Sequence, residues 1–426
     1  MCYAIPGKVT EINGKTVTVD YFGEKKTAIN ELSKIKIGDY VFAQGGFVIS
    51  PVAEKEALET LEAWQELFFA LKETDMRMSR LTRGAIGVDK KFSAILDKAA
   101  EGRELKREEL LTLLKTEDPA EQELLYKTAN FLRQKYSSNS CCVHGIIEFS
   151  NYCQNDCAYC GIRRSNTMLK RYRMSDDDIL RAAGEAIEKY GFKALVLQAG
   201  EDPEYTIERL VALIKEIKRR HAVLIFISVG EVGKEGLAAL YEAGARGLLM
   251  RFETSNPQLY ENLHPGDKLQ DRIDALKHAY EIGYLILTGG LIGLPAQTDE
   301  DLLNDILLTK ELHAEMFSFG PVLPEGPKTS LVLKTLAVAR IVDPVNAKIL
   351  VTTGFETLDQ EARRFGLLAG GNSVMLNVTP MKYRKLYSIY PDRAHVEEET
   401  DLQIKETLEL LKSLGRAPTD LGIKPL

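Results

Sequence analysis

The sequence is poor in cysteine and has no long apolar run. Only six of its 426 residues are cysteines. Three of them crowd into one loop and two are adjacent, which does not suit a disulfide framework. No stretch of about 18 apolar residues is present, so we expect no membrane span. The opening residues MCYAIPGKV lack the basic segment and apolar run of a signal peptide. We therefore expect a cytoplasmic protein with no membrane partner.

Positive charge is not in excess either. The formal net charge is −7, which argues against a general nucleic-acid-binding surface. Hydrophobic residues make up 45% and charged residues 27% of the chain, which is ordinary for a soluble globular protein. The length allows one large barrel and a small additional module.

The three clustered cysteines form the motif Cys153-x-x-x-Cys157-x-x-Cys160. Three thiolates at this spacing can bind three irons of a 4Fe–4S cluster and leave one iron open to a small molecule. A structural zinc site is the alternative, but zinc prefers four protein ligands. The nearest histidine in sequence is His144, inside an apolar run. The motif therefore favours an open cluster, which implies an anaerobic cell.

Two further cysteines, Cys141 and Cys142, are adjacent in a β-like run. Successive side chains of a strand point to opposite faces, so one of the two must point into the fold and the other out of it. Free cysteine is commonly buried. We predict that both are small buried residues.

The first 50 residues read as short strands rich in β-branched and aromatic side chains, with a hairpin turn at Asn13–Lys15. We expect a small antiparallel, OB-like β-barrel. A helix is predicted over Glu54–Lys72, with one apolar face: Leu58, Leu61, Trp64, Leu67, Phe68 and Leu71. The expected domains are residues 1–75, a linker over 76–93 that contains two glycines, and a larger domain over 94–426.

The larger domain begins with helical patterns, clearest over 105–114 and 121–134. Eight apolar runs then alternate with helical stretches: VHGIIEF, ALVLQAG, VLIFISVG, GLLMRFE, LILTGGLIG, MFSFGPV, KILVTTGF and SVMLNV. This alternation predicts βα units and a parallel sheet. Eight units predict a closed (βα)8 TIM barrel, an α/β fold whose active site lies at the C-terminal ends of the strands.

The string FSNYCQNDCAYCGIRRSN, followed by LKRYRM, resembles the signature of radical S-adenosylmethionine (SAM) enzymes. It is most similar to the branch that holds the FeFe-hydrogenase maturase HydE, methylornithine synthase and biotin synthase. The resemblance runs from about Ile95 to Gly422. It implies a complete barrel of the radical SAM type, a 4Fe–4S cluster, and S-adenosyl-L-methionine that is cleaved reductively to a 5′-deoxyadenosyl radical.

The resemblance also places the cofactors. Cys153, Cys157 and Cys160 would hold the cluster. Tyr159 would lie against adenine, Gly200-Glu201 would receive the methionine amino group, and Arg272 would pair with the methionine carboxylate. The whole expected SAM-binding set is Tyr159, Gln198, Gly200, Glu201, Ser228, Glu231, Arg251, Glu253, Arg272, Gly289, Gly293 and Leu294. Alone, a strand-end Glu or Ser is often only a helix cap, so the order of these residues along successive strands is what points to a site.

For the substrate end, the resemblance implies a set at the floor of the barrel: Thr352, Thr353, Met375, Tyr387 and Tyr390. The alternative for the two tyrosines is simple packing at i and i+3 on one helix face. The chain departs from the branch at Ala199, Gly247 and Phe252, where the branch has Ser, Arg and His. No cysteine follows Cys160, which excludes a second cluster.

The N-terminal residues Met1-Cys2-x-Ala-Ile-Pro-Gly-Lys, with GDYV and GGFVI, resemble HypC, a small chaperone of hydrogenase assembly. In that family the cysteine after the initiator Met binds an iron–cyanide–carbonyl fragment. A thiolate is a soft ligand suited to such iron. Cys2 is therefore a possible iron-fragment ligand. Gln44 stands where the family usually has His.

Three functions are compatible with these patterns. The first is a HydE-like maturase acting on a sulfur-ligated iron precursor with CO and cyanide, with Cys2 carrying or receiving the iron fragment. Its partners would be other hydrogenase maturation proteins and an electron donor. The second is a radical SAM mutase or lyase for an amino acid, resembling methylornithine synthase. The third is a noncatalytic scaffold that carries an iron fragment.

Overall fold

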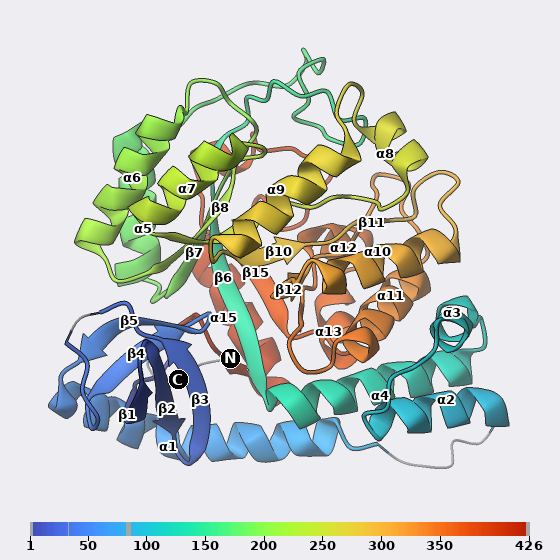
Figure 1. Ribbon diagram of the computed structural model, residues 1–426, viewed down its shortest axis with the longest axis horizontal. Helices are drawn as coiled ribbons and strands as arrows, with labels where there is room; N and C mark the ends of the chain where they lie inside the picture. Colours follow the sequence, from blue (N-terminus) through green and yellow to red (C-terminus); the bar gives the residue numbers. More distant parts are fainter. Residues whose placement is uncertain (1–2, 33, 82–86, 423–426) are drawn as a thin grey trace.

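The computed structural model describes residues 3–32, 34–81 and 87–422, which form a small barrel beside a large one (Figure 1). Cys2, one of the predicted ligands, lies outside these residues. None of the described helices is long and apolar enough to cross a membrane.

The small barrel is closed, with strand order β1-β2-β3-β5-β4. Its strands are β1 (Gly7–Asn13), β2 (Thr16–Tyr21), β3 (Glu24–Ile29), β4 (Tyr40–Gln44) and β5 (Phe47–Val52). Asn13 pairs with Thr16, and Gly14 between them has a φ of +60°. The predicted hairpin and the predicted small β-barrel are therefore confirmed, but the barrel is not wholly antiparallel, because β3 and β5 pair in parallel through Ile29 and Phe47.

Helix α1 (Glu54–Met78) covers the core of the small barrel. Trp64, Phe68 and Leu71 are buried in one cluster with strand residues such as Val19, because the helix presents one apolar face. Leu58, which the sequence placed on that face, is 49% exposed. In the first turn Ala57 is buried instead, so the prediction for Leu58 is wrong.

Three helices separate α1 from the large barrel: α2 (Lys90–Ala100), α3 (Arg107–Lys115) and α4 (Pro119–Ser137). Both ends of the predicted linker are thus helical, since α1 runs to Met78 and α2 begins at Lys90. Asp89 and Asp118 cap α2 and α4 by accepting bonds from backbone N–H groups of the first turn.

The large barrel is built from eight parallel strands in the order β14-β12-β10-β9-β8-β7-β6-β15. A bridge between Leu350 and Ser373 brings the two ends of this order together. The strands are β6 (Ser140–Ser150), β7 (Ala194–Ala199), β8 (Leu224–Ser228), β9 (Ala245–Leu249), β10 (Leu285–Thr288), β12 (Met316–Phe317), β14 (Lys348–Ile349) and β15 (Ser373–Asn377). Each of the eight predicted runs contributes one strand, and the predicted TIM-type barrel is confirmed.

Helices surround this barrel (Figure 1). They are α5 (Asp176–Glu188), α6 (Ile207–Arg220), α7 (Gly233–Ala243), α8 (Pro257–Leu263), α9 (Leu269–Glu281), α10 (Asp299–Glu311), α11 (Thr329–Val342), α12 (Thr353–Leu358), α13 (Ala362–Leu368), α14 (Met381–Arg384) and α15 (Thr400–Ser413). Short strands β11 (Leu291–Ile292) and β13 (Gly320–Pro321) pair with each other, and β16 (Ala417–Pro418) pairs with the start of β6.

The small barrel closes the N-terminal end of the large one. Phe47 and Ile49 of β5 share a buried cluster with Cys142 and Phe226 from inside the large barrel. Gly45 sits so close to this end that an added Cβ would lie 2.6 Å from Leu224 at the start of β8. The opposite end, where the C-termini of the strands meet, stays free of the module.

A buried charge network ties α1 to the large domain. Asp75 of α1 accepts two bonds from Arg133 of α4, at 2.7 and 2.8 Å, and lies 3.1 Å from Arg416. All three side chains are at most 1% exposed. The negative charge of one carboxylate thus offsets the positive charges of two buried guanidinium groups.

We expect Asp75→Asn to lower the free energy of unfolding by about 3–5 kcal/mol, because two buried cations lose their counter-charge. Glu59→Gln is the control: the Lys55–Glu59 pair is 4.0 Å apart and exposed, and such pairs contribute at most about 1 kcal/mol. Denaturant unfolding of both variants beside the parent checks this. Equal stability of the two variants would contradict it.

Candidate active site

The three-cysteine loop follows β6 and opens onto a cavity of about 330 Å³ at the C-terminal ends of the barrel strands. Cys153, Cys157 and Cys160 are half-buried and all line this cavity. Of the remaining predicted residues, the cavity also brings together Tyr159, Gln198, Gly200, Glu201, Ser228, Arg251, Glu253, Arg272, Thr352, Thr353, Met375, Tyr387 and Tyr390. Four predicted residues are not in its lining: Glu231, Gly289, Gly293 and Leu294.

Arg171 holds the loop in shape. Its guanidinium donates to the carbonyl oxygens of Ile162 at 2.7 Å and Arg163 at 2.6 Å. It also donates to the carbonyls of Asn166, at 3.1 Å, and Asn151. The guanidinium carries five donors in one plane, so one side chain can satisfy several loop carbonyls at once. The basic segment after the cysteines is therefore part of the loop's support.

Gly200, at the end of β7, lets the loop approach the sheet. An added Cβ would lie 2.2 Å from the carbonyl oxygen of Tyr152 and 2.8 Å from the Cβ of Cys153. Any side chain there would push the first cysteine outward. The neighbouring Asp202 fixes the same corner, because it accepts bonds from Arg173 at 2.7 and 2.8 Å and from Ser150 at 2.5 Å.

The three thiols suit metal binding rather than free thiolate chemistry. Burial raises the pKa of Cys157 to about 12 and that of Cys160 to about 11. Burial also raises the pKa of Cys153. Three mutually repelling thiolates would not form at neutral pH without a cation, because bound metal is what displaces thiol protons. The residues present fit a positively charged iron–sulfur core.

His264 is a neighbour of this loop that the sequence did not reveal. Its Nδ1 lies 3.4 Å from Cys157 Sγ, and its Nε2 lies 3.4 Å from the hydroxyl of Tyr159. Its ring stacks on Tyr260 with centroids 4.5 Å apart. Burial, and then the charge of Arg272, lowers the pKa of His264 to about 3. The imidazole is therefore neutral.

A nearby histidine reopens the question of a single zinc ion. The ligand atoms of one ion must all lie close together. Among the described residues, a group of three or more His, Cys, Asp or Glu ligand atoms within 4.8 Å of one another occurs only at Cys142, His144 and Asp420. Cys153, Cys157, Cys160 and His264 form no such group. Their spread fits a cluster, whose irons are separate, and not one tetrahedral ion.

Tyr159 and Glu253 form a buried pair beside the cysteines. The Tyr159 hydroxyl donates to Glu253 Oε1 at 3.0 Å, and Arg251 Nε lies 3.3 Å from Glu253 Oε2. Burial, and then the Glu253 carboxylate, raises the pKa of Tyr159 well above its ordinary value. Tyr159 therefore stays a neutral donor. Glu253 has a φ of +67°, a left-handed conformation that turns its side chain into the cavity.

Arg272 and Glu231 form an ion pair at the edge of the cavity. Arg272 Nε lies 2.8 Å from Glu231 Oε1, and the Glu231 backbone N–H donates to Glu201 Oε1 at 3.0 Å. Arg272 reaches the cavity lining although Glu231 does not. Arg272, the member of the pair that lines the cavity, can bind a carboxylate there.

The residues predicted for the substrate end lie together in the cavity. Tyr387 and Tyr390 follow the end of α14 at Arg384, in an irregular segment. The alternative of two tyrosines on one helix face is therefore wrong. Gln198 donates to the Tyr387 hydroxyl at 3.3 Å, which joins the SAM-side set to the substrate-side set.

A buried ion pair beside these tyrosines was missed. Arg393 Nη2 lies 2.6 Å from Glu148 Oε1, and Asn377 donates to Glu148 Oε2 at 2.7 Å. Glu148 is fully buried on β6, and Arg393 lines the cavity. The Glu in the otherwise apolar run IIEF was a usable signal. Arg393 lies outside any regular element and gave none.

Comparison with known proteins agrees with this geometry. Residues 147–308 match the Radical SAM superfamily, and residues 1–64 match the HupF/HypC family. The FeFe hydrogenase maturase subunit HydE of Thermotoga maritima is 38% identical over 334 residues, covering 76% of this chain and 94% of that protein. The 3-methylornithine synthase of Methanosarcina acetivorans is 29% identical, covering 76% of this chain and 93% of that protein. The crystal structure of methylornithine synthase (PylB) matches with a TM-score of 0.67 at 27% identity, over 76% of this chain and 97% of that chain.

The barrel, the three-cysteine loop and these similarities define a radical SAM enzyme, a class that uses a 4Fe–4S cluster and S-adenosyl-L-methionine. Within that class, the chain belongs to the family of the FeFe hydrogenase maturase HydE, and it carries a HupF/HypC-family module at its N-terminus. The predicted resemblances, enzyme class and cofactors are confirmed.

The close approach at Gly200 gives a test. We expect Gly200→Ala to cost about 1–3 kcal/mol of overpacking in the loop, and so to reduce the iron bound per chain after anaerobic reconstitution. Gly184→Ala on α5 is the control, because its nearest neighbour would be 3.5 Å from the added Cβ. Iron and sulfide analysis of both variants measures this. Full cluster content in Gly200→Ala would contradict the steric argument.

Proposed function

We propose that this chain is a hydrogenase maturase that acts on a sulfur-ligated iron precursor carrying CO and cyanide. One observation carries the proposal: a barrel 38% identical to a HydE maturase is fused to a HupF/HypC-family module. Both halves resemble proteins of hydrogenase assembly. Its partners would be other maturation proteins and an electron donor.

The cavity provides a place for both cofactors. Cys153, Cys157 and Cys160 would hold the cluster, Gly200-Glu201 would receive the methionine amino group, and Arg272 would pair with the methionine carboxylate. Tyr159, Leu294 and the backbone near Gly289 and Gly293 would border the adenine. When bound, the cluster and S-adenosyl-L-methionine supply a one-electron cleavage that yields an adenosyl radical. The protein's own part is to hold the reactants in place and to exclude water.

Charge pairing supports the anchoring role of Arg272. Its partner Glu231 is 32% exposed, whereas the Arg272 side chain is 8% exposed. A ligand carboxylate can share the guanidinium, because its five donors exceed the two bonds that it makes, to Glu231 and to the backbone carbonyl of Arg251. Leu294 packs in a small apolar cluster against which Tyr159 also rests, so an aromatic ring beside Tyr159 would meet apolar surface.

The substrate would occupy the part of the cavity lined by Thr352, Thr353, Met375, Tyr387 and Tyr390. This part combines hydroxyl groups with apolar surface from Ile146 and Leu350. Hydroxyls in a dry cavity need hydrogen-bond partners, which ligands of a metal complex can supply. The alternative amino-acid substrate would need paired anchors for its two charged groups, and Arg251 and Glu253, which lie 3.3 Å apart, are the candidates.

The substrate class can be tested directly. Anaerobic protein is given S-adenosyl-L-methionine and reductant, with an iron–cyanide–carbonyl complex or with free amino acids, and 5′-deoxyadenosine is measured. We expect stimulation by the iron complex together with shifted CO and CN infrared bands. Stimulation by amino acids alone would assign a mutase or lyase. If cluster-loaded protein formed no 5′-deoxyadenosine, both enzymatic functions would be excluded and the noncatalytic scaffold would remain.

The cluster assignment predicts the effect of its ligands. Cys157→Ala should reduce S-adenosyl-L-methionine cleavage to background, because the remaining two thiols cannot hold the cluster. Cys153→Ala and Cys160→Ala should behave alike. Cys141→Ser, which changes a buried thiol far from the loop, is the matched control. Retained cleavage in any of the three Ala variants would overturn the ligand set.

The proposed role of Cys2 predicts a separation of activities. Cys2→Ser should leave S-adenosyl-L-methionine cleavage intact and impair transfer of the iron fragment, because only the thiolate suits such iron. Cleavage and infrared-detected transfer are measured on the same preparation. An equal loss of both activities would assign a structural role to the module.

A further inference from the structure

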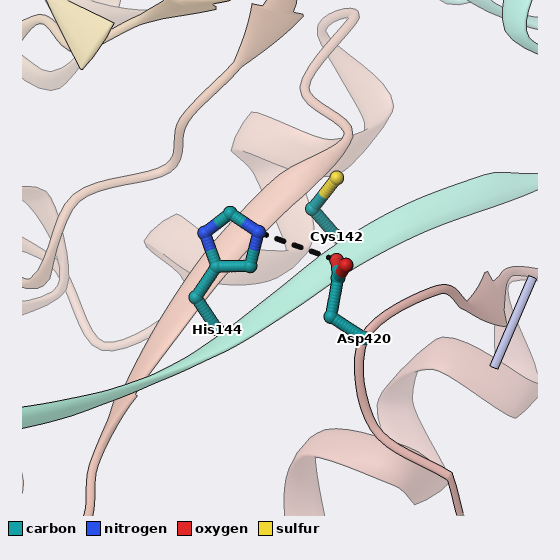
Figure 2. A group of neighbouring side chains, drawn as sticks. All are labelled: Cys142, His144 and Asp420. Carbon is teal, nitrogen blue, oxygen red and sulfur yellow. Dashed lines mark ion pairs between the residues drawn. The ribbon is translucent and has the colours of Figure 1, made fainter. Parts of the chain in front are cut away.

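A second group of potential metal ligands lies at the opposite end of the large barrel. Cys142, His144 and Asp420 each offer one ligand atom, and these atoms all lie within 4.8 Å of one another. The side chains are at most 3% exposed. His144 Nε2 lies 3.3 Å from Asp420 Oδ2, with Cys142 beside them (Figure 2).

The fold brings these residues together for simple reasons. Cys142 and His144 alternate on β6, so both side chains point to the same face of the sheet. Asp420 arrives from the C-terminal segment, because β16 pairs with the start of β6 through Ala417–Ser140 and Pro418–Cys141. The neighbouring Cys141 belongs to a different core cluster, as expected for a side chain on the other face.

The imidazole is held in position by its surroundings. His144 stacks on Phe226 with ring centroids 4.9 Å apart at 27°. Phe226 needs Gly247 in turn, since a Cβ there would lie 1.8 Å from its ring. The Nδ1 of His144 is buried and makes no hydrogen bond to the described residues.

Charges of both signs surround the three ligand atoms. Asp420 also accepts a bond from Thr419 at 2.6 Å, and the buried Lys348 ion-pairs with Glu315 nearby. Burial raises the pKa of the Cys142 thiol well above its ordinary value, and the Asp420 carboxylate raises it further. A metal ion would have to displace that proton, and the Lys348 charge would help to stabilise the resulting thiolate.

A buried His–Asp ion pair with a packed cysteine is the simpler explanation. It accounts for the pair, yet it does not account for a thiol, an imidazole and a carboxylate converging from two separate segments. We propose that Cys142, His144 and Asp420 bind one divalent transition-metal ion of the zinc or iron(II) class. The thiolate and imidazole favour these ions over magnesium or calcium. The site does not depend on the proposed function.

This site is separate from the candidate active site. Ser150 follows His144 by six positions along β6, or about 20 Å at roughly 3.3 Å per residue. An apolar layer intervenes: Ile146, Leu249, Leu350 and Met375 line the active-site cavity and also belong to the cluster that contains Cys142. Phe47 and Ile49 of the small barrel belong to the same cluster and cover it at the N-terminal end of the large barrel.

The test uses full-length, cluster-loaded protein under anaerobic conditions. Zinc is added, the excess is removed, and zinc per chain is measured with its X-ray absorption spectrum. We expect on the order of one zinc per chain with a single sulfur ligand. Competition with iron(II) decides which ion the site prefers, and either ion supports the proposal.

Matched variants make the test specific. Cys142→Ser and His144→Gln should each weaken zinc binding at least about 10-fold, while Cys141→Ser should bind zinc as the parent does. Unchanged cluster content and 5′-deoxyadenosine formation would show that the variants are folded. No zinc in the parent would overturn the proposal. Equal zinc binding by Cys142→Ser and Cys141→Ser would also overturn it.

Discussion

The structure depends on the way β6 is fixed on both sides. This strand of eleven buried residues is hydrogen-bonded in parallel to β7 on one side and β15 on the other. Its C-terminal end leads directly into the three-cysteine loop, and its N-terminal end carries Cys142 and His144. A shift of one residue would turn every side chain to the other face. Such a shift would remove Glu148 from Asn377 and Arg393, so the register is also set by buried charge.

Two segments next to the active-site cavity are positioned by a buried carboxylate paired with an arginine. Asp202 with Arg173 fixes the corner beside the cluster loop, and Glu148 with Arg393 fixes the segment that holds Tyr387. Buried ion pairs are weak contributors to stability compared with apolar packing, but breaking one is costly. Their value here is placement: they attach irregular segments, which have no ladder hydrogen bonds, to one position on the barrel.

Local patterns were sufficient to predict the two barrels, the helix that follows the small one, and the three-cysteine loop, because alternation, spacing and turn residues are short-range signals. They were insufficient for His264, which reaches Cys157 only through the fold, and for Arg393, which lies in an irregular segment. The alternative of one helix face for Tyr387 and Tyr390 failed because i, i+3 spacing does not show where a helix ends. The pair Cys142 and His144 could have been found, since alternate positions on a predicted strand share a face.

The placement of the module bears on the proposed handling of an iron fragment. Tyr3, which follows Cys2 in sequence, donates to Asn139 just before β6, and β5 closes the same N-terminal end of the barrel. The active-site cavity lies at the other end, beyond an apolar layer of barrel side chains. A polar iron–cyanide fragment cannot cross such a layer without losing its hydrogen-bond partners. For the proposed iron fragment, the layout therefore favours exchange between the module and another protein over direct transfer into the cavity of the same chain.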